Sequence, residues 1–137
     1  MREIKFRAWI PEEKSMVEVL VIDWHWGNIS FARNEKDKEW ATIPTNNLDK
    51  VALMQYTGLK DSKGREIYEG DIATVECECG YKANMPVGWG YNGWRLEKQW
   101  SHRFPSGELE FNHTERVEVI GDIYENPELL KEIVNED

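Results

Sequence analysis

The chain has 137 residues, of which 40% are hydrophobic and 31% are charged, and its formal net charge is −9. This composition predicts one soluble globular domain whose core is large enough to fold without disulfides or a metal. The chain has no apolar run near the roughly 18 residues of a transmembrane helix, and its start lacks the continuous apolar segment of a signal peptide. We expect a cytoplasmic protein that binds no membrane.

The acidic residues are concentrated at the C-terminal end. Residues 106–137 contain ten Asp and Glu against two Lys and Arg, which gives this segment a charge of −8. An acidic protein is poorly suited to binding a phosphate backbone. The segment is interpreted as a solvated face, with a basic partner or mimicry of nucleic-acid charge as the alternatives.

The first quarter of the chain reads as strands joined by turns. Residues 3–9 alternate with period two, and the polar run 11–15 begins with Pro and predicts a turn. Residues 16–26 are apolar on both faces, which is typical of a central strand or of a strand at an interface. In that strand, Trp24 and Trp26 share a face with Met16. The pair Gly27–Asn28 then predicts a tight hairpin turn into a strand over 29–33.

The next segments are short. Residues 34–39 predict a charged loop, and residues 40–43 predict a short strand stopped by Pro44. Residues 45–50 fit a helical turn capped by Thr45 or a plain loop. Residues 51–56 allow helix or strand, and the Thr-Gly pair that follows favours a strand ending in a turn.

Dense turn chemistry marks the middle of the chain. Asp61 opens a turn and Gly64 supplies a residue with positive φ, which together predict a hairpin loop. Gly70 supplies the next bend, before a strand over 72–77. A Gly-Asp bend that leads into an apolar strand is common in small bent barrels of SH3-like type, although an analogy of fold says little about activity.

The clearest hairpin follows, over residues 85–100, with Asn92–Gly93 as a two-residue type I′ turn. This register places Tyr91 opposite Trp94 and Trp89 opposite Leu96, on one aromatic face. The face is interpreted as hydrophobic core, as a protein–protein interface, or as a platform that stacks on a ligand or a nucleic acid. Trp89, Tyr91 and Trp94 are the candidate binding residues.

The C-terminal part begins with residues 101–115, which have little regular pattern, and continues with a strand over 116–124. A short helix over 126–135 has a readable start, because Asn126 is a favoured N-cap and Pro127 suits the first helical position. The helix is too short to persist without packing against a sheet.

No constellation of catalytic or metal-binding residues emerges. Cys77 and Cys79 are expected to be reduced thiols, and with His102 or His113 they could begin a zinc site. Their spacing is not that of a usual zinc motif, so no metal and no cofactor is predicted. His25 reads as a structural or solvent-facing histidine. Asp71 and Asp122 each follow a glycine and read as turn residues, so no catalytic residue is assigned.

Three blocks carry a family resemblance: REIKFRAW at 2–9, LMQYTGLKDSKGREIYEGDI at 53–72 and VIGDIYENPELL at 119–130. They lie at the start, middle and end of the chain, and in all three it resembles the YopX-like family of phage and prophage proteins. The resemblance implies a small protein from a bacteriophage or an integrated element, with self-association as a further expectation. It brings no catalytic residues that could be carried over.

These observations predict a mainly β (α+β) fold in a single domain over 1–137. It comprises an N-terminal β-hairpin region over 1–50, a small, strongly bent SH3-like barrel over 51–125 and a C-terminal helix over 126–135. We expect a non-enzymatic accessory protein that binds another protein, of host or virus, and that self-associates as a homo-oligomer. The alternatives are an SH3-like module associated with nucleic acid, which the charge of −9 disfavours, and an enzyme with an unrecognised active site.

Overall fold

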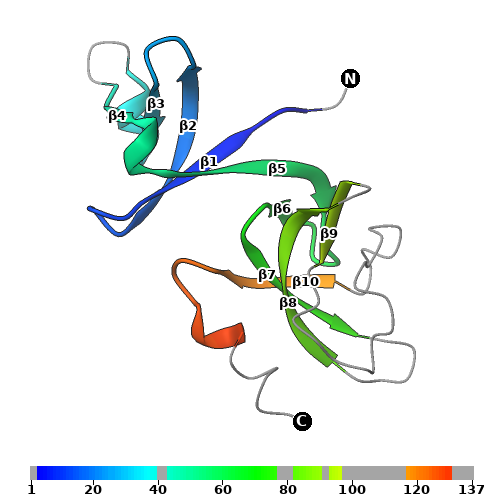
Figure 1. Cartoon of the computed structure of the whole chain (residues 1–137). Coiled ribbons are helices and arrows are strands. Elements are labelled where there is room, and N and C mark those ends of the chain that lie inside the picture. The colour runs from blue at the N-terminus through cyan, green and yellow to red at the C-terminus, as the bar shows by residue number, and fades with distance from the viewer. Residues whose placement is uncertain (1–2, 40–42, 77–81, 91–92, 97–116, 131–137) are drawn as a thin grey trace. The chain divides into compact units, whose positions relative to one another are not determined.

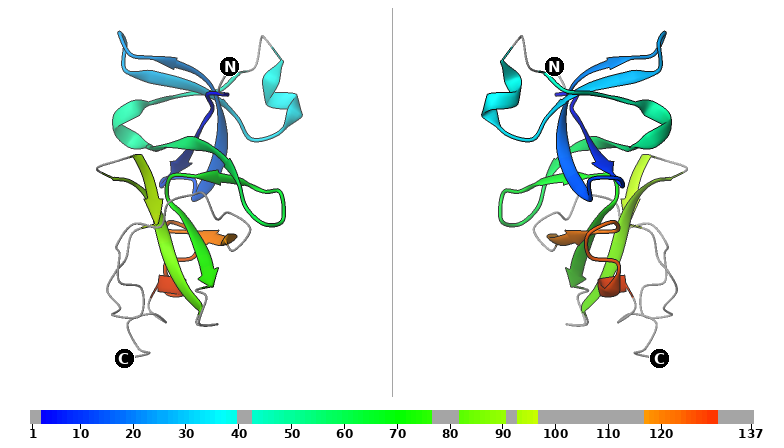
Figure 2. Two further views of the ribbon diagram at one scale, coloured as in Figure 1. Left: turned by 90° about the vertical axis from the view of Figure 1, so that its right-hand side faces the viewer. Right: turned by 90° about the vertical axis from the view of Figure 1, so that its left-hand side faces the viewer.

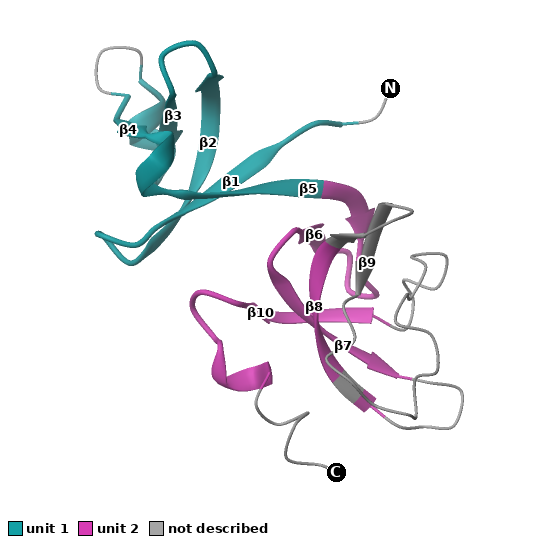
Figure 3. Ribbon diagram, viewed as in Figure 1, with its two compact units in different colours: residues 1–56 teal, residues 57–137 magenta. Residues whose placement is uncertain are grey.

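The computed structural model describes residues 3–39, 43–76, 82–90, 93–96 and 117–130. Its strands form two antiparallel sheets (Figure 1). The chain divides into two compact units, unit 1 over residues 1–56 and unit 2 over residues 57–137 (Figure 3). Strand β5 (Ala52–Lys60) begins in unit 1 and ends in unit 2.

Unit 1 is built on antiparallel strands whose order in the sheet is β4-β3-β2-β1-β5, with β6 (Glu66–Tyr68) of unit 2 beyond β5. Its elements in chain order are β1 (Phe6–Ile10), β2 (Ser15–Asp23), β3 (Asn28–Ala32), the 3-10 turn η1 (Glu35–Lys38), β4 (Thr45–Asn47), the 3-10 turn η3 (Leu48–Lys50) and the first part of β5. The predicted alternation is realised from Phe6 onward in β1, which buries Ala8 and Ile10 completely, whereas residues 3–5 lie outside the strand. These two residues pack with Val17, Ile29 and Phe31 as the core of unit 1.

The prediction that residues 16–26 form a central strand is confirmed for β2, which lies between β1 and β3. The strand stops at Asp23, which pairs with Asn28. The predicted Gly27–Asn28 turn is therefore wrong, because Asn28 is the first residue of β3 and the loop is the four residues 24–27. A bulge between Val19 and Val21 shifts the register of β2 against β3 and bends the strand.

The short segments differ in detail from their predictions. The expected loop over 34–39 contains η1, where the Asn34 side chain accepts a hydrogen bond from the Asp37 amide at 3.2 Å. Thr45 does not cap a helical turn but begins β4, and the turn that follows is capped by Asn47. Of the predicted strand over 40–43, the described Ile43 lies outside any strand, and the rest falls outside the described residues.

Unit 2 contains a sheet in the order β10-β7-β8-β9. Its strands are β6 (Glu66–Tyr68), which belongs to the sheet of β5, and β7 (Asp71–Glu76), β8 (Lys82–Gly90), β9 (Gly93–Leu96) and β10 (Val117–Asp122). The core of unit 2 is an apolar cluster drawn from β6, β7, β8 and β10: Ile67, Ala73, Val75, Met85, Val87 and Val117.

The predicted hairpin in the middle of the chain is confirmed. Strands β5 and β6 flank the Asp61 turn, in which Gly64 has a φ of +81°. Gly70, with a φ of +86°, makes the bend that leads into β7. The predicted end of this strand at the Thr-Gly pair is wrong, because β5 runs through Gly58 to Lys60.

The mainly β class is confirmed, but the predicted SH3-like barrel is not. The described strands form two sheets and no closed barrel (Figure 2). The edge strands are β4 and β6 in one sheet and β10 and β9 in the other. Of the glycine bends in this region, the one at Gly64 closes the β5–β6 hairpin, and the Gly70 bend, which suggested the barrel, connects β6 of one sheet to β7 of the other. Of the predicted C-terminal helix, residues 128–130 are helical and residues 131–135 lie outside the described part.

Candidate protein-binding surface

Two tryptophans stand at the tip of the β2–β3 hairpin, in the loop over residues 24–27. The loop is closed by two hydrogen bonds to Asp23: its carboxylate Oδ1 accepts from the Trp26 amide at 3.0 Å, and its carbonyl accepts from the Gly27 amide at 2.9 Å. Gly27 has a φ of +70°, a conformation that glycine adopts without strain. The local sequence thus fixes the backbone that carries the rings.

The rings themselves are in solvent. Trp24 is 70% exposed and Trp26 is 75% exposed. His25 lies between them in the sequence, and its ring meets that of Trp26 edge to face, with the centroids 4.8 Å apart and the planes at 87°. We call Trp24, His25 and Trp26 the aromatic tip.

The base of the hairpin is firmly packed, in contrast to its tip. Ile29 and Phe31 of β3 are 0% and 1% exposed. The Gly27 carbonyl accepts a hydrogen bond from the Leu48 amide at 2.9 Å, which ties the loop to η3. The hairpin therefore presents exposed rings on an ordered support, an arrangement suited to binding a surface.

The aromatic tip was missed in the sequence because Trp24 and Trp26 continue the strand pattern of Met16. The structure separates them, because the strand ends at Asp23. A usable signal was present: an Asp three residues before Trp26 and a Gly directly after it are turn residues, which together favour a loop.

The predicted aromatic hairpin exists as β8 and β9, but in a different register. Gly90 pairs with Gly93 and Trp89 with Trp94, so the connecting residues are 91–92 and not Asn92–Gly93. Trp89 thus lies opposite Trp94, and Val87 takes the place opposite Leu96. Tyr91 lies outside the described residues, as do the side chains of Trp89 and Trp94, so their use as a binding face stays a prediction.

The predicted metal ligands also lie outside the described part: Cys77, Cys79, His102 and His113. Within the described residues, no group of three or more His, Cys, Asp or Glu is arranged to hold a metal ion. Over the same part of the chain, no helix has the length and apolar character needed to cross a membrane.

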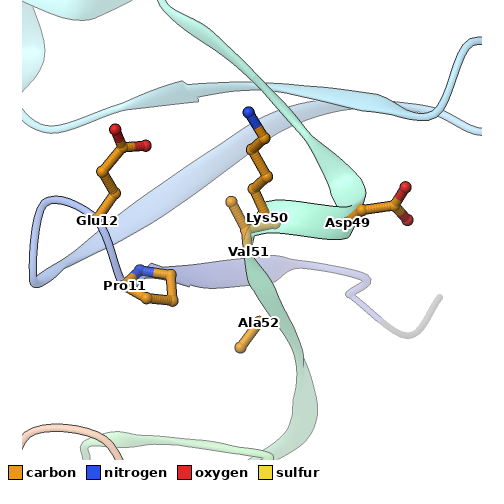
Figure 4. A pocket seen from close by; sticks show the side chains of 6 residues that line it. All are labelled: Pro11, Glu12, Asp49, Lys50, Val51 and Ala52. Atoms are coloured by element: carbon orange, nitrogen blue, oxygen red, sulfur yellow. The ribbon is translucent and has the colours of Figure 1, made fainter.

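A hollow of about 460 Å³ lies in unit 1 beside η3 and the turn after β1 (Figure 4). Pro11, Val51 and Ala52 supply its apolar lining. Glu12 and Lys50 extend from its border in the same general direction, while Asp49 points away from both (Figure 4). Glu12 and Lys50 have opposite charges, and none of the residues that line the hollow is a nucleophile placed between them, so the hollow contains no assembled acid–base pair.

Comparison with known proteins places the chain in a family. The model of the family described as YopX protein matches residues 5–131. The chain belongs to the YopX family.

Solved structures agree with this assignment. Protein EF1440 from Enterococcus faecalis matches with 25% sequence identity and a TM-score of 0.65, over 95% of this chain and 99% of that one. Protein yopX from Bacillus subtilis matches with 21% identity and a TM-score of 0.60 over the same shares of the two chains. Curated proteins yield no match. Neither structure's name states an activity, so the YopX likeness carries the fold and no reaction.

Two of the blocks that carry the YopX resemblance meet in unit 2, at the Asp61 turn. The Asp61 carboxylate accepts hydrogen bonds from the amides of Lys63 at 2.9 Å, Arg65 at 2.8 Å and Val119 at 2.8 Å. The Arg65 guanidinium donates to the Val119 carbonyl at 2.8 Å, and the Ser62 amide donates to the Val117 carbonyl at 2.9 Å. This part of the YopX signature is thus a structural junction between the turn and β10.

The two remaining buried acids of the signature also serve turns. Asp71 accepts a hydrogen bond from the Tyr68 amide at 2.7 Å, and Asp122 accepts from the amides of Tyr124 and Glu125 at 2.9 and 2.8 Å. Asn126 does not use its side chain to cap the helix that follows it. Its Oδ1 instead accepts from the Asp122 amide at 3.2 Å. These contacts support the interpretation of Asp71 and Asp122 as turn residues.

Proposed function

We propose that this YopX family member is a non-enzymatic accessory protein, of phage or prophage origin, that binds another protein in the bacterial cytoplasm. The observation that carries the proposal is the aromatic tip, where Trp24 and Trp26 are 70% and 75% exposed. Tryptophan, with tyrosine and arginine, is enriched at the energetically important positions of protein–protein interfaces, and burying its large ring removes much apolar surface from water.

The support beneath the tip strengthens this proposal. Rings held on an ordered backbone lose less conformational freedom on binding than rings on a mobile loop, so more of the burial energy remains as affinity. The hydrogen bonds from Trp26 and Gly27 to Asp23 and the buried Phe31 provide that order.

The chemistry of the buried acids favours binding over catalysis. Asp61, Asp71 and Asp122 are 6%, 2% and 7% exposed, and each accepts hydrogen bonds from backbone amides. A carboxylate whose oxygens already accept hydrogen bonds from backbone amides stabilises the fold, and it is not positioned to take a proton from a substrate. These three acids are therefore assigned to the scaffold.

A photo-crosslinking experiment tests the proposal. The photoreactive residue p-benzoylphenylalanine replaces His25 in the full chain, and a matched variant carries it at exposed Glu12, in the same unit. Irradiation in bacterial cells is expected to link position 25 to a reproducible protein, and the double substitution Trp24→Ala and Trp26→Ala to abolish that link. Equal labelling from position 12, or labelling that survives the double substitution, would contradict the assignment of the tip.

The same variants separate protein binding from the nucleic-acid alternative. Exposed indole rings can stack on bases, but a single-strand site also needs a basic groove and shows a strong dependence on salt. We expect no tip-dependent binding of fluorescent single-stranded DNA or RNA at moderate salt. Salt-sensitive binding that the double substitution removes would replace protein binding with the nucleic-acid function.

The β8–β9 hairpin is a second proposed contact surface, with Trp89, Tyr91 and Trp94 as its residues, and self-association is the use proposed for it. Light scattering after size exclusion, over a range of concentrations, tests this. We expect an oligomer that Trp89→Ala or Trp94→Ala shifts towards monomer, while Trp24→Ala leaves it unchanged. A strict monomer at high concentration would count against self-association.

A further inference from the structure

Strands β1 and β2 of unit 1 pair along only part of their length. Their pairing runs from Ile10 opposite Ser15 to Arg7 opposite Glu18 and stops there. Beyond this point the two strands diverge (Figures 1 and 2). The N-terminal end of β1 remains hydrogen-bonded to β5, since the carbonyl of Lys5, just before β1, accepts a hydrogen bond from the Tyr56 amide at 2.9 Å.

The divergence has a local cause in β2. A bulge between Val19 and Val21 sets Leu20 as the extra residue against β3. A bulged strand bends and increases its twist. The C-terminal part of β2, over Val19–Asp23, therefore stays paired with β3 and is no longer paired with β1.

The result is an open strand edge beside a groove that is lined by apolar side chains and by Lys5. A hollow of about 200 Å³ separates Ile4 and Phe6 on one side from residues 19–22 of β2 on the other. Ile4 is 71% exposed and Val21 is 54% exposed. On this side, no strand in the described part of the chain pairs with β2 beyond Glu18.

In contrast to the edge of β2, the exposed edge of β10 is covered by another segment of the chain. Outward-facing groups of β10 bond to the turn after β5: the Val119 amide donates to Asp61, and the Val117 carbonyl accepts from Ser62. Covering an edge in this way protects it from pairing with another chain. The edge of β2 over Val19–Asp23 has no such cover in the described residues, although the side chains of residues 19–22 are apolar.

The charges near the groove are already engaged within the chain. The Lys5 ammonium lies 3.5 Å from the Glu3 carboxylate and 5.2 Å from the centre of the Tyr56 ring. Glu18 lies 3.0 Å from Lys38, and Asp23 accepts from Trp26. Because each of these charges already has a partner within the chain, a neutral segment suits the groove better than a charged one.

We propose that an extended, uncharged segment of another protein, apolar at alternate positions, adds as a strand to β2 over Val19–Asp23. Backbone hydrogen bonds to the β2 edge would hold it, and alternate side chains would enter the groove beside Ile4 and Val21. Its path would run alongside the strand that carries the aromatic tip. The inference rests on the proposed protein-binding function and names the mode in which the partner is held.

The test uses the full chain and a defined probe, a fluorescein-labelled peptide of alternating threonine and valine. Two control peptides replace a central valine with proline or every threonine with glutamate. Fluorescence anisotropy measures binding to wild type, to Val21→Lys and Ile4→Lys in the groove, and to Ile120→Lys on covered β10. Ile4→Lys serves as the second groove variant because Ile4 is 71% exposed, so its replacement leaves the core intact.

We expect wild type and Ile120→Lys to bind the neutral peptide equally, and each groove variant to bind it at least about tenfold more weakly, because pairing would bury an uncompensated charge. The proline and glutamate peptides should bind weakly to all forms. Equal binding of the neutral and proline peptides overturns the inference, as does binding unaffected by both groove variants. A wild-type dimer that Val21→Lys dissociates overturns it as well, because a second copy then occupies the edge.

This result is read separately from the crosslinking at position 25. Peptide binding that fails while tip-dependent crosslinking persists removes strand addition alone. Crosslinking that fails while the peptide binds as expected removes the role of the tip and leaves the β2 edge as the binding element.

Discussion

The carboxylate of Asp61 serves three backbone donors that come from two distant parts of the sequence. Two of them, Lys63 and Arg65, lie in its own turn, and the third, Val119, lies in β10. A charged acceptor strengthens each of these hydrogen bonds. Asp61 therefore couples the formation of a local turn to the placement of a strand distant in sequence.

This role makes the stability of the protein depend on acid pH through Asp61. Burial raises the pKa of Asp61, but hydrogen bonds from the Val119, Arg65 and Lys63 amides and the charge of Arg65 lower it, to a net value below the usual 3.8. Because the folded pKa is depressed, the ionised form favours folding. The contribution is fully present above the unfolded pKa and is lost as pH falls through the folded pKa.

The substitution Asp61→Asn tests this assignment. We expect it to lower the free energy of unfolding at neutral pH by about 2 kcal/mol, because an amide cannot accept all three bonds. Urea unfolding over a range of pH should show the difference from wild type shrinking as pH falls below about 4. A difference that stays constant with pH would mean that shape, and not charge, is what the site needs.

Two glycines of unit 2 are required for different reasons, and alanine distinguishes them. A Cβ at Gly121 would lie 2.5 Å from Asn126 Oδ1, whereas one at Gly64 would meet nothing within 4 Å but would sit at a φ of +81°. We expect Gly121→Ala to cost about 2 kcal/mol by overpacking and Gly64→Ala to cost about 1 kcal/mol by backbone strain.

Thermal unfolding of two second-site variants separates these mechanisms. Gly64→Asn should recover much of the loss at Gly64, since asparagine tolerates positive φ. Adding Asn126→Ala should make Gly121→Ala less costly than the sum of the two single changes. Additive losses at Gly121 and Asn126 would refute the steric explanation.

At the scale of elements, the β2–β3 hairpin separates stability from recognition. We expect Trp24→Ala with Trp26→Ala to change the free energy of unfolding by less than about 0.5 kcal/mol, because both rings are already in water. Phe31→Ala, on the buried face of the same hairpin, should cost about 3–5 kcal/mol. Chemical denaturation followed by circular dichroism measures both. A large loss from the double substitution would show that the rings support the fold.

Elements whose signals are local were predictable from the sequence. Alternation over residues 3–9 predicted β1, and Asp61 with Gly64 predicted the β5–β6 hairpin, since period-two burial and positive φ depend on few neighbours. Strand ends were less predictable. The sequence pattern continues through Trp24, but the pairing of Asp23 with Asn28 ends the strand.

The candidate site was predictable only in kind. The sequence indicated exposed or interfacial aromatic residues and placed them at Trp89, Tyr91 and Trp94. Among the residues whose exposure the structure gives, the most exposed aromatic rings of Trp and Tyr are those of Trp24 and Trp26. Exposure depends on where a strand ends and what covers it, and both are set by contacts distant in sequence. The barrel prediction was not confirmed for the same reason, since closure of a sheet depends on pairing between strands that are distant in sequence and not on any single turn.

At the scale of the whole molecule, charge is divided unevenly between the two units. Residues 1–56 contain eight Lys and Arg against nine Asp and Glu, and residues 57–137 contain nine against seventeen. Unit 1, which carries the aromatic tip and the open strand edge, is thus nearly neutral, while unit 2 carries −8. A neutral surface suits an uncharged partner, and excess charge of one sign keeps a protein soluble at a cost in self-repulsion.

This distribution predicts that salt stabilises the protein by screening unit 2. Raising NaCl from about 0.01 M to about 0.1 M shortens the Debye length from about 30 Å to about 10 Å, and we expect the free energy of unfolding to rise by about 1 kcal/mol as repulsion among the acids weakens. Urea titrations at the two salt concentrations measure this. The substitutions Glu76→Lys and Glu125→Lys, which change the net charge from −9 to −5, should reduce the gain. A gain that is unchanged by the two substitutions, or a loss of stability with salt, would mean that attractive ion pairs outweigh the repulsion.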